Sequence, residues 1–290
     1  INSVKDQSLL KKSKLYVNLE PCDHHGKTPP CSELIVRKQI PEVFVGTVDP
    51  FSKVKGKGIQ ILRNGGCQVK YGILENDCKE LNKRFFTFHE KKRPYIILKW
   101  AQTKDGYIDV IRKKNQTNRP TWITNETDRL LVHKWRAEEQ AILVGTKTAR
   151  LDNPMLNIRN WRGNQPLRIV IDKALKLSSE LNLFDNSQKT LVYNSVKSDI
   201  NNNTEYKKLK SDQMINEITA DLHQRNIQSL IVEGGAQLIN TFIEQNIWDE
   251  ARVFTGDIVF KDGVNAPDIK SEPQISTAIG NSNLSVFRNF

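Results

Sequence analysis

The chain has 290 residues, enough for two domains of ordinary size, and its 44 lysines and arginines against 33 aspartates and glutamates give a formal net charge of +11. Its four cysteines are too few for a disulfide framework, and no apolar run approaches the roughly 18 residues of a membrane-spanning helix. Because the basic residues are spread along the chain, phosphate-bearing small molecules are favoured as partners, and we expect a cytoplasmic protein that binds neither nucleic acid nor membrane.

Strands and helices alternate through the first third of the chain, which predicts a mostly parallel sheet with helices on both faces. The expected strands are residues 15–19, 42–46 and 67–71. The expected helices are the end of a helix at residues 2–13, then 32–39 with Ser32 as N-cap, 58–63 and 80–89. A basic, proline-containing step at residues 90–94 marks a boundary, so we predict domains at residues 1–92 and 93–290.

Two cysteines flank a loop directly after the first expected strand. Cys22 follows Pro21 and Cys31 follows the proline pair Pro29-Pro30, so both thiols belong to one stiff loop. Two thiolates can supply half of a tetrahedral zinc site, whereas a catalytic zinc needs a third protein ligand and a water. His24 and His25 are so close to Cys22 that wrapping them around the same metal would strain the loop. Two thiols without a metal remain the alternative.

The rest of the chain continues the alternation and predicts a second α/β unit. Its expected strands are residues 95–101, 141–144, 167–171, 190–193, 227–232, 250–255 and 284–290. Its expected helices are residues 125–138, 214–225 and 237–245, the first with Leu130, Leu131, Val132 and Trp135 facing inward. The asparagine-rich residues 198–206 are expected to form a mobile loop.

A second candidate site lies where the strand of residues 227–232 runs into Glu233, Gly234 and Gly235 and then a helix. Two glycines at such a turn leave backbone amides accessible at a helix N-terminus, which suits a phosphate group. A carboxylate at the C-terminal edge of a strand in an open α/β sheet lies where ligands usually bind. The Gly-x-Gly-x-x-Gly dinucleotide fingerprint is absent, and a purely structural turn is the alternative.

Residues 19–31 read Leu-Glu-Pro-Cys-x-His-His-Gly-x-Thr-Pro-Pro-Cys, which closely resembles the deaminase half of the bifunctional riboflavin-biosynthesis deaminase/reductase family. The resemblance implies an incomplete, cytidine-deaminase-like three-layer domain with Cys22 and Cys31 as zinc ligands. In that family a His-Ala-Glu element supplies the third ligand and the proton-transferring glutamate. It would precede Ile1, so the chain resembles a fragment that begins just after it. Nucleic-acid deaminases of the same superfamily have a tighter Cys-x-x-Cys.

Further motifs resemble the reductase half of the same family, whose fold is similar to that of dihydrofolate reductase. They are Lys99 with Asp105-Gly106, Trp122-Ile123-Thr124, Arg136-Ala137, Gly145-x-x-Thr148, Asp152-x-Pro154-x-Leu156-x-x-Arg159, and Val232-Glu233-Gly234-Gly235. The resemblance implies NADPH contacts at Ala101, Trp122, Thr148, Asp152, Gly235, Ala236, Gln237 and Leu238. It implies contacts to the ribose phosphate of the substrate at Arg136, Leu156, Arg159 and Glu233, with Lys99 and Glu233 nearest the reacting carbon. Pro120 replaces a small polar residue of the family, which puts that contact in doubt.

The reading that follows is an NADPH-dependent reductase of 5-amino-6-(5-phosphoribosylamino)uracil, a phosphoribosylamino-pyrimidine, in a homo-oligomer. The linked deamination of 2,5-diamino-6-(5-phosphoribosylamino)pyrimidin-4-one is expected of the longer protein and not of this chain. The alternatives are a nucleic-acid-acting zinc deaminase with an accessory domain and a non-catalytic, deaminase-like scaffold. The reductase hypothesis requires Glu233 and Arg159 to face one shared cleft.

Overall fold

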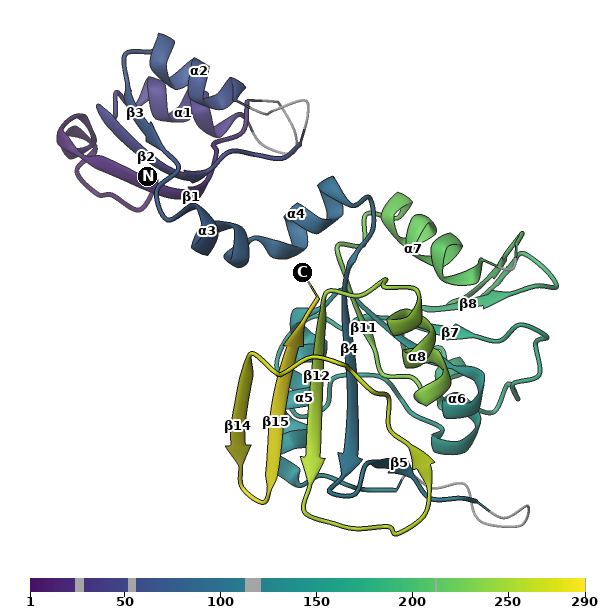
Figure 1. The fold of residues 1–290 in the computed structure, drawn as a ribbon. Helices are drawn as coiled ribbons and strands as arrows, with labels where there is room; N and C mark the ends of the chain where they lie inside the picture. The colour runs from purple at the N-terminus through teal and green to yellow at the C-terminus, as the bar shows by residue number, and fades with distance from the viewer. Residues whose placement is uncertain (24–28, 52–55, 113–120, 212, 290) are drawn as a thin grey trace. The chain divides into compact units, whose positions relative to one another are not determined.

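The computed structural model describes residues 1–23, 29–51, 56–112, 121–211 and 213–289. The chain divides into two compact units, Ile1–Lys92 and Arg93–Phe290, whose elements are labelled along the chain in Figure 1.

The first unit is built on a parallel sheet of three strands in the order β1-β2-β3, where β1 is Lys14–Leu19, β2 is Glu42–Thr47 and β3 is Gln68–Tyr71. Helices α1 (Cys31–Arg37) and α2 (Lys57–Asn64) supply Ile35 and Leu62 to a core that also holds Val43 and Val45 of β2. The short 3₁₀ helix η1 (Gln7–Lys12) adds Leu10 to this core. Alternate residues of β2 therefore point to the helices, as a pleated strand requires.

Three expectations for the first unit are corrected by its hydrogen bonds. Only residues 7–12 of the expected 2–13 helix are helical, as η1. Residues 80–89 form parts of two helices, α3 (Glu75–Leu81) and α4 (Lys83–Glu90), because Asn82 leaves helical geometry and its side-chain amide donates to the Cys78 carbonyl at 2.8 Å. Helix α1 begins at Cys31, and Ser32 is not its N-cap; the Ser32 hydroxyl donates instead to the Cys22 carbonyl at 2.9 Å.

The second unit is organised by a ten-stranded sheet in the order β14-β15-β12-β4-β11-β6-β7-β8-β10-β9. Strands β12, β4, β11, β6, β7, β8 and β10 are parallel, whereas β15, β14 and β9 pair antiparallel at the two edges. The strands are β4 (Tyr95–Thr103), β6 (Ala141–Gly145), β7 (Leu167–Ile171), β8 (Thr190–Asn194), β9 (Asp199–Asn201), β10 (Thr204–Lys208), β11 (Ser229–Val232), β12 (Glu250–Gly256), β14 (Ile275–Ile279) and β15 (Ser282–Arg288). A small ribbon pairs β5 (Tyr107–Asp109) with β13 (Val264–Asn265).

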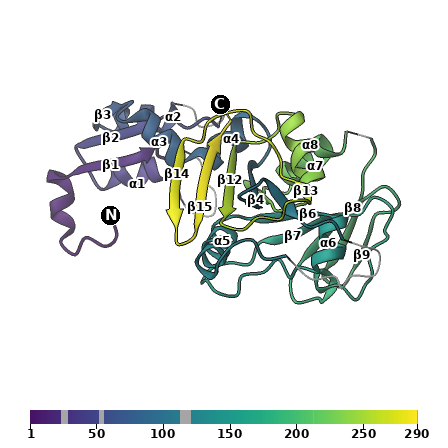
Figure 2. The same cartoon turned by 60° about the horizontal axis from the view of Figure 1, so that its bottom comes forward.

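Helices cover both faces of the central strands, as Figure 2 shows. Helices α7 (Met214–Gln224) and α8 (Ala236–Glu244) pack on the face that carries Ile96 and Leu98 of β4. On the other face, α5 (Glu126–Glu138) packs near Ile97, and α6 (Thr146–Asp152) and the 3₁₀ helix η2 (Asn182–Phe184) pack against β6, β7 and β8. Because these strands are buried on both faces, they read in the sequence as continuous apolar runs.

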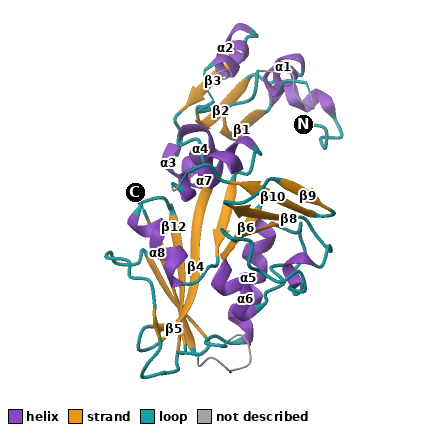
Figure 3. Cartoon of the chain, turned by 90° about the vertical axis from the view of Figure 1, so that its right-hand side faces the viewer, coloured by secondary structure: helices purple, strands orange, loops and turns teal. Residues whose placement is uncertain are grey.

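Expectations for the second unit fail mainly at its edges. Residues 198–206, expected to be a loop, include β9 and the start of β10, which form an edge hairpin. Strand β10 of this hairpin lies beside β8 (Figure 3). Its turn is made by Asn202 at a φ of 51°. Strands β5, β13 and β14 were not predicted. In α5, Val132 and Trp135 are buried as expected, but Leu130 is 39% exposed. The N-cap of α5 is Asn125, which shares a capping box with Asp128.

Arg168 provides a test of the packing on the α6 side of the sheet. This side chain is 1% exposed and donates to Thr190 Oγ1 at 3.0 Å, the Asn182 carbonyl at 3.0 Å, Asp185 Oδ1 at 2.9 Å and the Gln188 carbonyl at 2.8 Å. Arg168→Met keeps the volume but leaves these acceptors without a donor, so we expect a loss of about 3 kcal/mol in the free energy of unfolding.

Urea titration followed by tryptophan fluorescence measures this loss in the second unit alone, because all five tryptophans lie in residues 93–290. Arg162→Met, at an exposed position, is the matched control and is expected to shift stability by less than about 0.5 kcal/mol. Equal midpoints for the two variants would contradict the prediction.

Candidate active site

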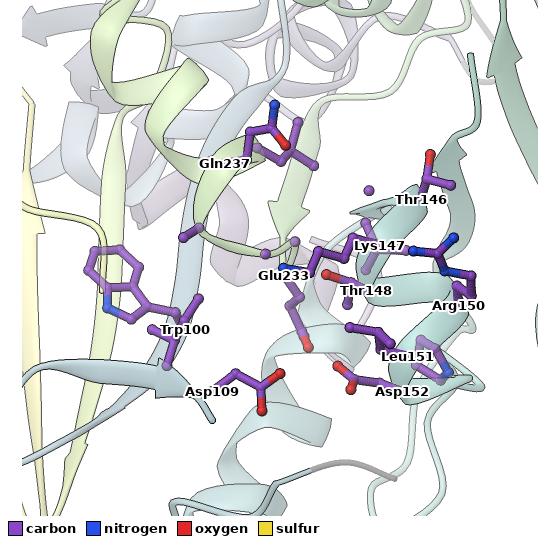
Figure 4. Close-up of a pocket in the computed structure, with 18 of the residues that line it drawn as sticks. Trp100, Asp109, Thr146, Lys147, Thr148, Arg150, Leu151, Asp152, Glu233 and Gln237 are labelled. Carbon is purple, nitrogen blue, oxygen red and sulfur yellow. The ribbon is translucent and has the colours of Figure 1, made fainter. Parts of the chain in front are cut away.

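The carboxyl ends of three neighbouring parallel strands, β4, β11 and β6, form one edge of the central sheet. Lys99 lies in the middle of β4, level with the end of β11. Glu233 directly follows β11, and Gly145 ends β6. A cavity of about 1300 Å³ opens there, and Figure 4 shows side chains from α6 and from the turn after β11 around it. Pockets for one drug-sized ligand measure about 300–1,000 Å³, so this cavity has room for two small molecules.

All residues of the second unit for which the resemblance implies an NADPH or substrate contact line this one cavity. They are Lys99, Ala101, Trp122, Arg136, Thr148, Asp152, Leu156, Arg159, Glu233, Gly235, Ala236, Gln237 and Leu238. Glu233 and Arg159 therefore share a cleft, as the reductase hypothesis requires. The individual role of each residue stays a prediction.

The turn between β11 and α8 is closely packed at its two glycines. A Cβ atom on Gly234 would lie 2.6 Å from Cδ2 of Leu238, and one on Gly235 would lie 3.2 Å from Oγ1 of Thr148 in α6. The close packing brings the backbone of the turn and the N-terminus of α8 to the cavity wall. The first N–H groups of a helix have no partner within the helix, so they can bind an anion or a phosphate.

Glu233 forms the central ion pair of the cavity. Arg136 Nε donates to Oε1 of Glu233 at 3.0 Å and Arg136 Nη2 donates to Oε2 at 2.8 Å, while Lys99 Nζ lies 3.9 Å from Oε2. Burial opposes ionisation of Glu233, but the charges of Arg136 and Lys99 and the hydrogen bonds from Arg136 outweigh it and lower the pKa of Glu233 to about 2. Burial lowers the pKa of Lys99, although the Glu233 carboxylate acts in the opposite direction.

The two arginines proposed for phosphate binding differ in their surroundings. The fork of Arg136 faces Glu233, and its Nη1 donates to the Asn157 carbonyl at 3.2 Å, so all three nitrogens of its guanidinium are engaged within the protein. Arg159 donates from Nη1 to Asn157 Oδ1 at 2.9 Å and pairs with no carboxylate in the part of the chain that the structure describes. Arg159 is therefore the better candidate for binding a phosphate group.

Several cavity residues escaped the sequence reasoning. Lys147 and Arg150 of α6 line the cavity, and neither forms an ion pair among the described residues. The Gly145-x-x-Thr148 motif could have pointed to them, because they occupy the same short helix. Lys173 also lines the cavity.

Asp109 and Arg112 were missed because β5 was not predicted. Arg112 Nε donates to Asp109 Oδ2 at 3.0 Å, and Arg112 Nη2 lies 3.4 Å from Asp152 Oδ1. Burial raises the pKa of Asp152, while the Arg112 charge opposes that rise. These residues tie the segment after β5 to the end of α6 at the rim of the cavity.

In the first unit, the Pro-Cys turn is held by Glu20 and Gly58. The buried Glu20 carboxylate accepts hydrogen bonds from the backbone N–H groups of Asp49 at 3.1 Å, Gly56 at 3.0 Å and Ile59 at 3.2 Å. A Cβ on Gly58 would collide with the Pro21 carbonyl oxygen, so α2 can approach the turn only with glycine there. Glu20 is thus a structural residue of the motif.

Cys22 and Cys31 face each other across this turn. The Cys31 backbone N–H donates to Cys22 Sγ at 3.3 Å, and burial and the neighbouring Cys22 raise the pKa of the Cys31 thiol. His24, His25 and Pro120 lie outside the described residues. Within the described ranges, no three His, Cys, Asp or Glu side chains come together as metal ligands, so the described part of the turn supplies two thiols, half of the ligands of a tetrahedral zinc site.

Comparisons with known proteins agree with this architecture. The model of the family described as the RibD C-terminal domain matches residues 94–272. The riboflavin biosynthesis protein RibD of Aquifex aeolicus is 35% identical over 267 residues, which cover 89% of this chain and 73% of that protein. The RibD protein of Bacillus amyloliquefaciens is 36% identical, with 91% and 72% covered.

The chain belongs to the RibD family of riboflavin biosynthesis proteins. A crystal structure of a diaminohydroxyphosphoribosylaminopyrimidine deaminase/5-amino-6-(5-phosphoribosylamino)uracil reductase from Thermotoga maritima is 34% identical, with a TM-score of 0.83 over 96% of this chain and 79% of that one. The riboflavin biosynthesis reductase Rib7 of Saccharomyces cerevisiae, 20% identical with a TM-score of 0.54 over 72% of this chain and 99% of its own, shares the fold.

The α/β fold expected for residues 93–290 and the recognition of the family are thereby confirmed. This RibD chain is an enzyme of riboflavin biosynthesis with a reductase domain, and reductases of the RibD family depend on NADPH. In the described ranges no helix combines the length and the apolar character needed to cross a membrane.

The low pKa of Glu233 predicts how stability depends on pH. A lowered carboxyl pKa contributes stability above the unfolded-state value of 4.5, and this contribution is lost as the pH falls toward about 2. Glu233→Gln removes it and leaves Arg136 without its counter-charge. We expect the variant to be clearly less stable than the parent at pH 7, with the difference shrinking between about pH 5 and pH 3.

Tryptophan-monitored urea titrations at several pH values measure this difference. Glu126→Gln is the matched control, since Glu126 is 95% exposed and forms only a surface pair with Arg129 at 3.4 Å. A stability difference for Glu233→Gln that stays constant from pH 7 to about pH 3 would show that the carboxylate is not held ionised by its neighbours.

Proposed function

We propose that residues 93–290 reduce 5-amino-6-(5-phosphoribosylamino)uracil to its ribitylamino product with NADPH. The observation that carries this proposal is the large cavity shared by the glycine turn before α8, the mostly buried Glu233–Arg136–Lys99 cluster and the guanidinium of Arg159. The Thermotoga maritima relative is named for this uracil reductase activity, which supports the substrate class.

The residues around α6 and α8 suit a phosphorylated dinucleotide. The turn at Gly234 and Gly235 presents backbone N–H groups at the start of α8, and Lys147 and Arg150 add two cations from α6. When bound, NADPH supplies the hydride. Because Lys147 and Arg150 have no carboxylate partner in the described chain, we assign them to the extra phosphate that distinguishes NADPH from NADH.

The cluster at Glu233 would serve the sugar of the substrate. Opening the ribose gives an imine at C1, and reduction adds a hydride to this carbon and a proton to the nitrogen. Lys99 is the group that we propose to donate the proton, because its lowered pKa makes the ammonium a better acid than the guanidinium of Arg136. Glu233 would hold Lys99 in place and bond a sugar hydroxyl, and Arg159 would bind the phosphate.

For the first unit we propose that Cys22 and Cys31 are two of the zinc ligands of a deaminase site that is complete only in the longer protein, the role named in the Thermotoga maritima deaminase/reductase. Its substrate would be 2,5-diamino-6-(5-phosphoribosylamino)pyrimidin-4-one. The facing thiols and the rigid support from Glu20 favour this role over a pair of inert cysteines. A zinc site of this kind requires a further ligand beyond the described side chains.

The reductase proposal is tested by NADPH oxidation with the uracil substrate. The chain is expected to oxidise NADPH, and the double variant Lys147→Ala/Arg150→Ala to raise the KM for NADPH about tenfold or more while changing the KM for NADH little. Lys176→Ala, at an exposed position outside the cavity, is the control. No substrate-dependent oxidation would refute the function, and equal losses with both nucleotides would refute only the assignment of Lys147 and Arg150.

The zinc proposal predicts weak metal binding by this chain. With two thiols from the described residues, we expect zinc well below one per chain after gel filtration, and no ammonia from the diamino substrate. The double variant Cys22→Ser/Cys31→Ser should remove the residual zinc, whereas Cys78→Ser should not. Ammonia release by the chain, or residual zinc that survives the double variant, would contradict this prediction.

A further inference from the structure

The loop that carries Arg159 is held by side chains from other parts of the chain. It begins at Leu156, which is 2% exposed and adopts a left-handed φ of 49°. Isolated irregular backbone of this kind persists only where its surroundings fix it. The hydrogen-bond partners of residues 157–159 therefore decide where the guanidinium of Arg159 lies.

Gln165 bonds both backbone groups of the residue before Arg159. The Ile158 N–H donates to Oε1 of Gln165 at 2.8 Å, and Nε2 of Gln165 donates to the Ile158 carbonyl at 3.1 Å. The side-chain amide thus pairs with the loop as a neighbouring strand would. Gln165 itself is exposed, so no core packing explains its two short contacts.

His133 holds the next backbone group. It lies on α5, is 4% exposed, and accepts the Arg159 backbone N–H at Nδ1 over 3.4 Å. An acceptor nitrogen requires a neutral imidazole. Burial and the charges of Arg136 and Arg159 lower the pKa of His133 to about 4, which keeps it neutral near pH 7.

The same loop is also tied to the ion-paired cluster. Arg136 Nη1 donates to the Asn157 carbonyl at 3.2 Å, and Arg159 Nη1 donates to Asn157 Oδ1 at 2.9 Å. Backbone groups of residues 157, 158 and 159 are thus each bonded to a side chain from α5 or from Gln165. A long arginine side chain can present its fork to a phosphate at low entropic cost only if its backbone and its first contact are fixed.

We propose that His133 and Gln165 are positioning residues that set Arg159 for the phosphate of the substrate. This inference rests on the proposed function, in which Arg159 binds that phosphate. Because neither side chain would touch the reacting atoms, their loss should weaken binding of the phosphorylated substrate and leave the chemical step unchanged.

A double-mutant cycle on the full chain tests this inference. Arg159→Met is expected to raise the KM for the uracil substrate about tenfold or more, and Gln165→Met and His133→Leu about three- to tenfold each, at unchanged kcat. In the Arg159→Met background, the second substitution should add nothing, because it acts through Arg159. The Ki of ribose 5-phosphate as a competitor should follow the same pattern.

Matched variants separate positioning from folding. His133→Asn keeps an acceptor close to Nδ1 and should retain a KM within about twofold of the parent, whereas His223→Leu and Gln224→Leu on α7 should change neither KM nor Ki. Gln165→Met removes only an exposed amide, so it is expected to remain folded by tryptophan fluorescence even if His133→Leu does not.

The outcomes distinguish the two hypotheses. If Arg159→Met raises KM but the Gln165 and His133 effects add to it in full, the positioning role is refuted and the phosphate role of Arg159 survives. If Arg159→Met itself leaves KM and the Ki of ribose 5-phosphate unchanged, the phosphate assignment fails.

Discussion

The bidentate ion pair between Arg136 and Glu233 is the interaction on which the cavity depends. Its two side chains are only 11% and 10% exposed, so each charge needs the other. Arg136 comes from α5, Glu233 from the end of β11, and Lys99, at 3.9 Å, from β4. Without the carboxylate, two cations would face each other in a poorly hydrated space. Together with Lys99, the pair therefore joins α5, β11 and β4. Arg136 also fixes the loop at Asn157.

The sheet order explains how these groups meet. Strand β11 is inserted between β4 and β6, so residues 98, 143 and 232 lie in register although they are far apart in the chain. Parallel strands place their carboxyl ends on the same edge, and the crossover to α8 begins there. The glycine turn, the acidic residue after β11 and the lysine of β4 consequently border one cavity. Helix α6, which follows β6, brings the cations Lys147 and Arg150 to the same place.

Sequence reasoning succeeded where the physical signal is local. The central strands β4, β6 and β11 are buried on both faces, so they appear in the sequence as apolar runs. The hairpin β9–β10 is polar, and its sequence therefore predicts a loop. An edge strand is held by backbone pairing, which leaves little trace in side-chain pattern. The break between α3 and α4 at Asn82 likewise depends on one side-chain hydrogen bond, which the spacing of apolar residues does not predict.

The sequence by itself pointed to many members of the candidate site, because the strand-end motifs and the Pro-Cys turn are each contained in a few consecutive residues, but it missed Lys147, Arg150, Asp109 and Arg112. Only the tertiary structure decided which members face each other. Arg136 and Glu233 are 97 positions apart, and Arg159 and His133 are 26 apart. Whether an arginine fork faces a carboxylate, a backbone carbonyl or an open cavity depends on the separation of elements distant in the chain. Charge and hydrogen-bond energies change steeply over a few ångströms, so no local pattern can fix that outcome.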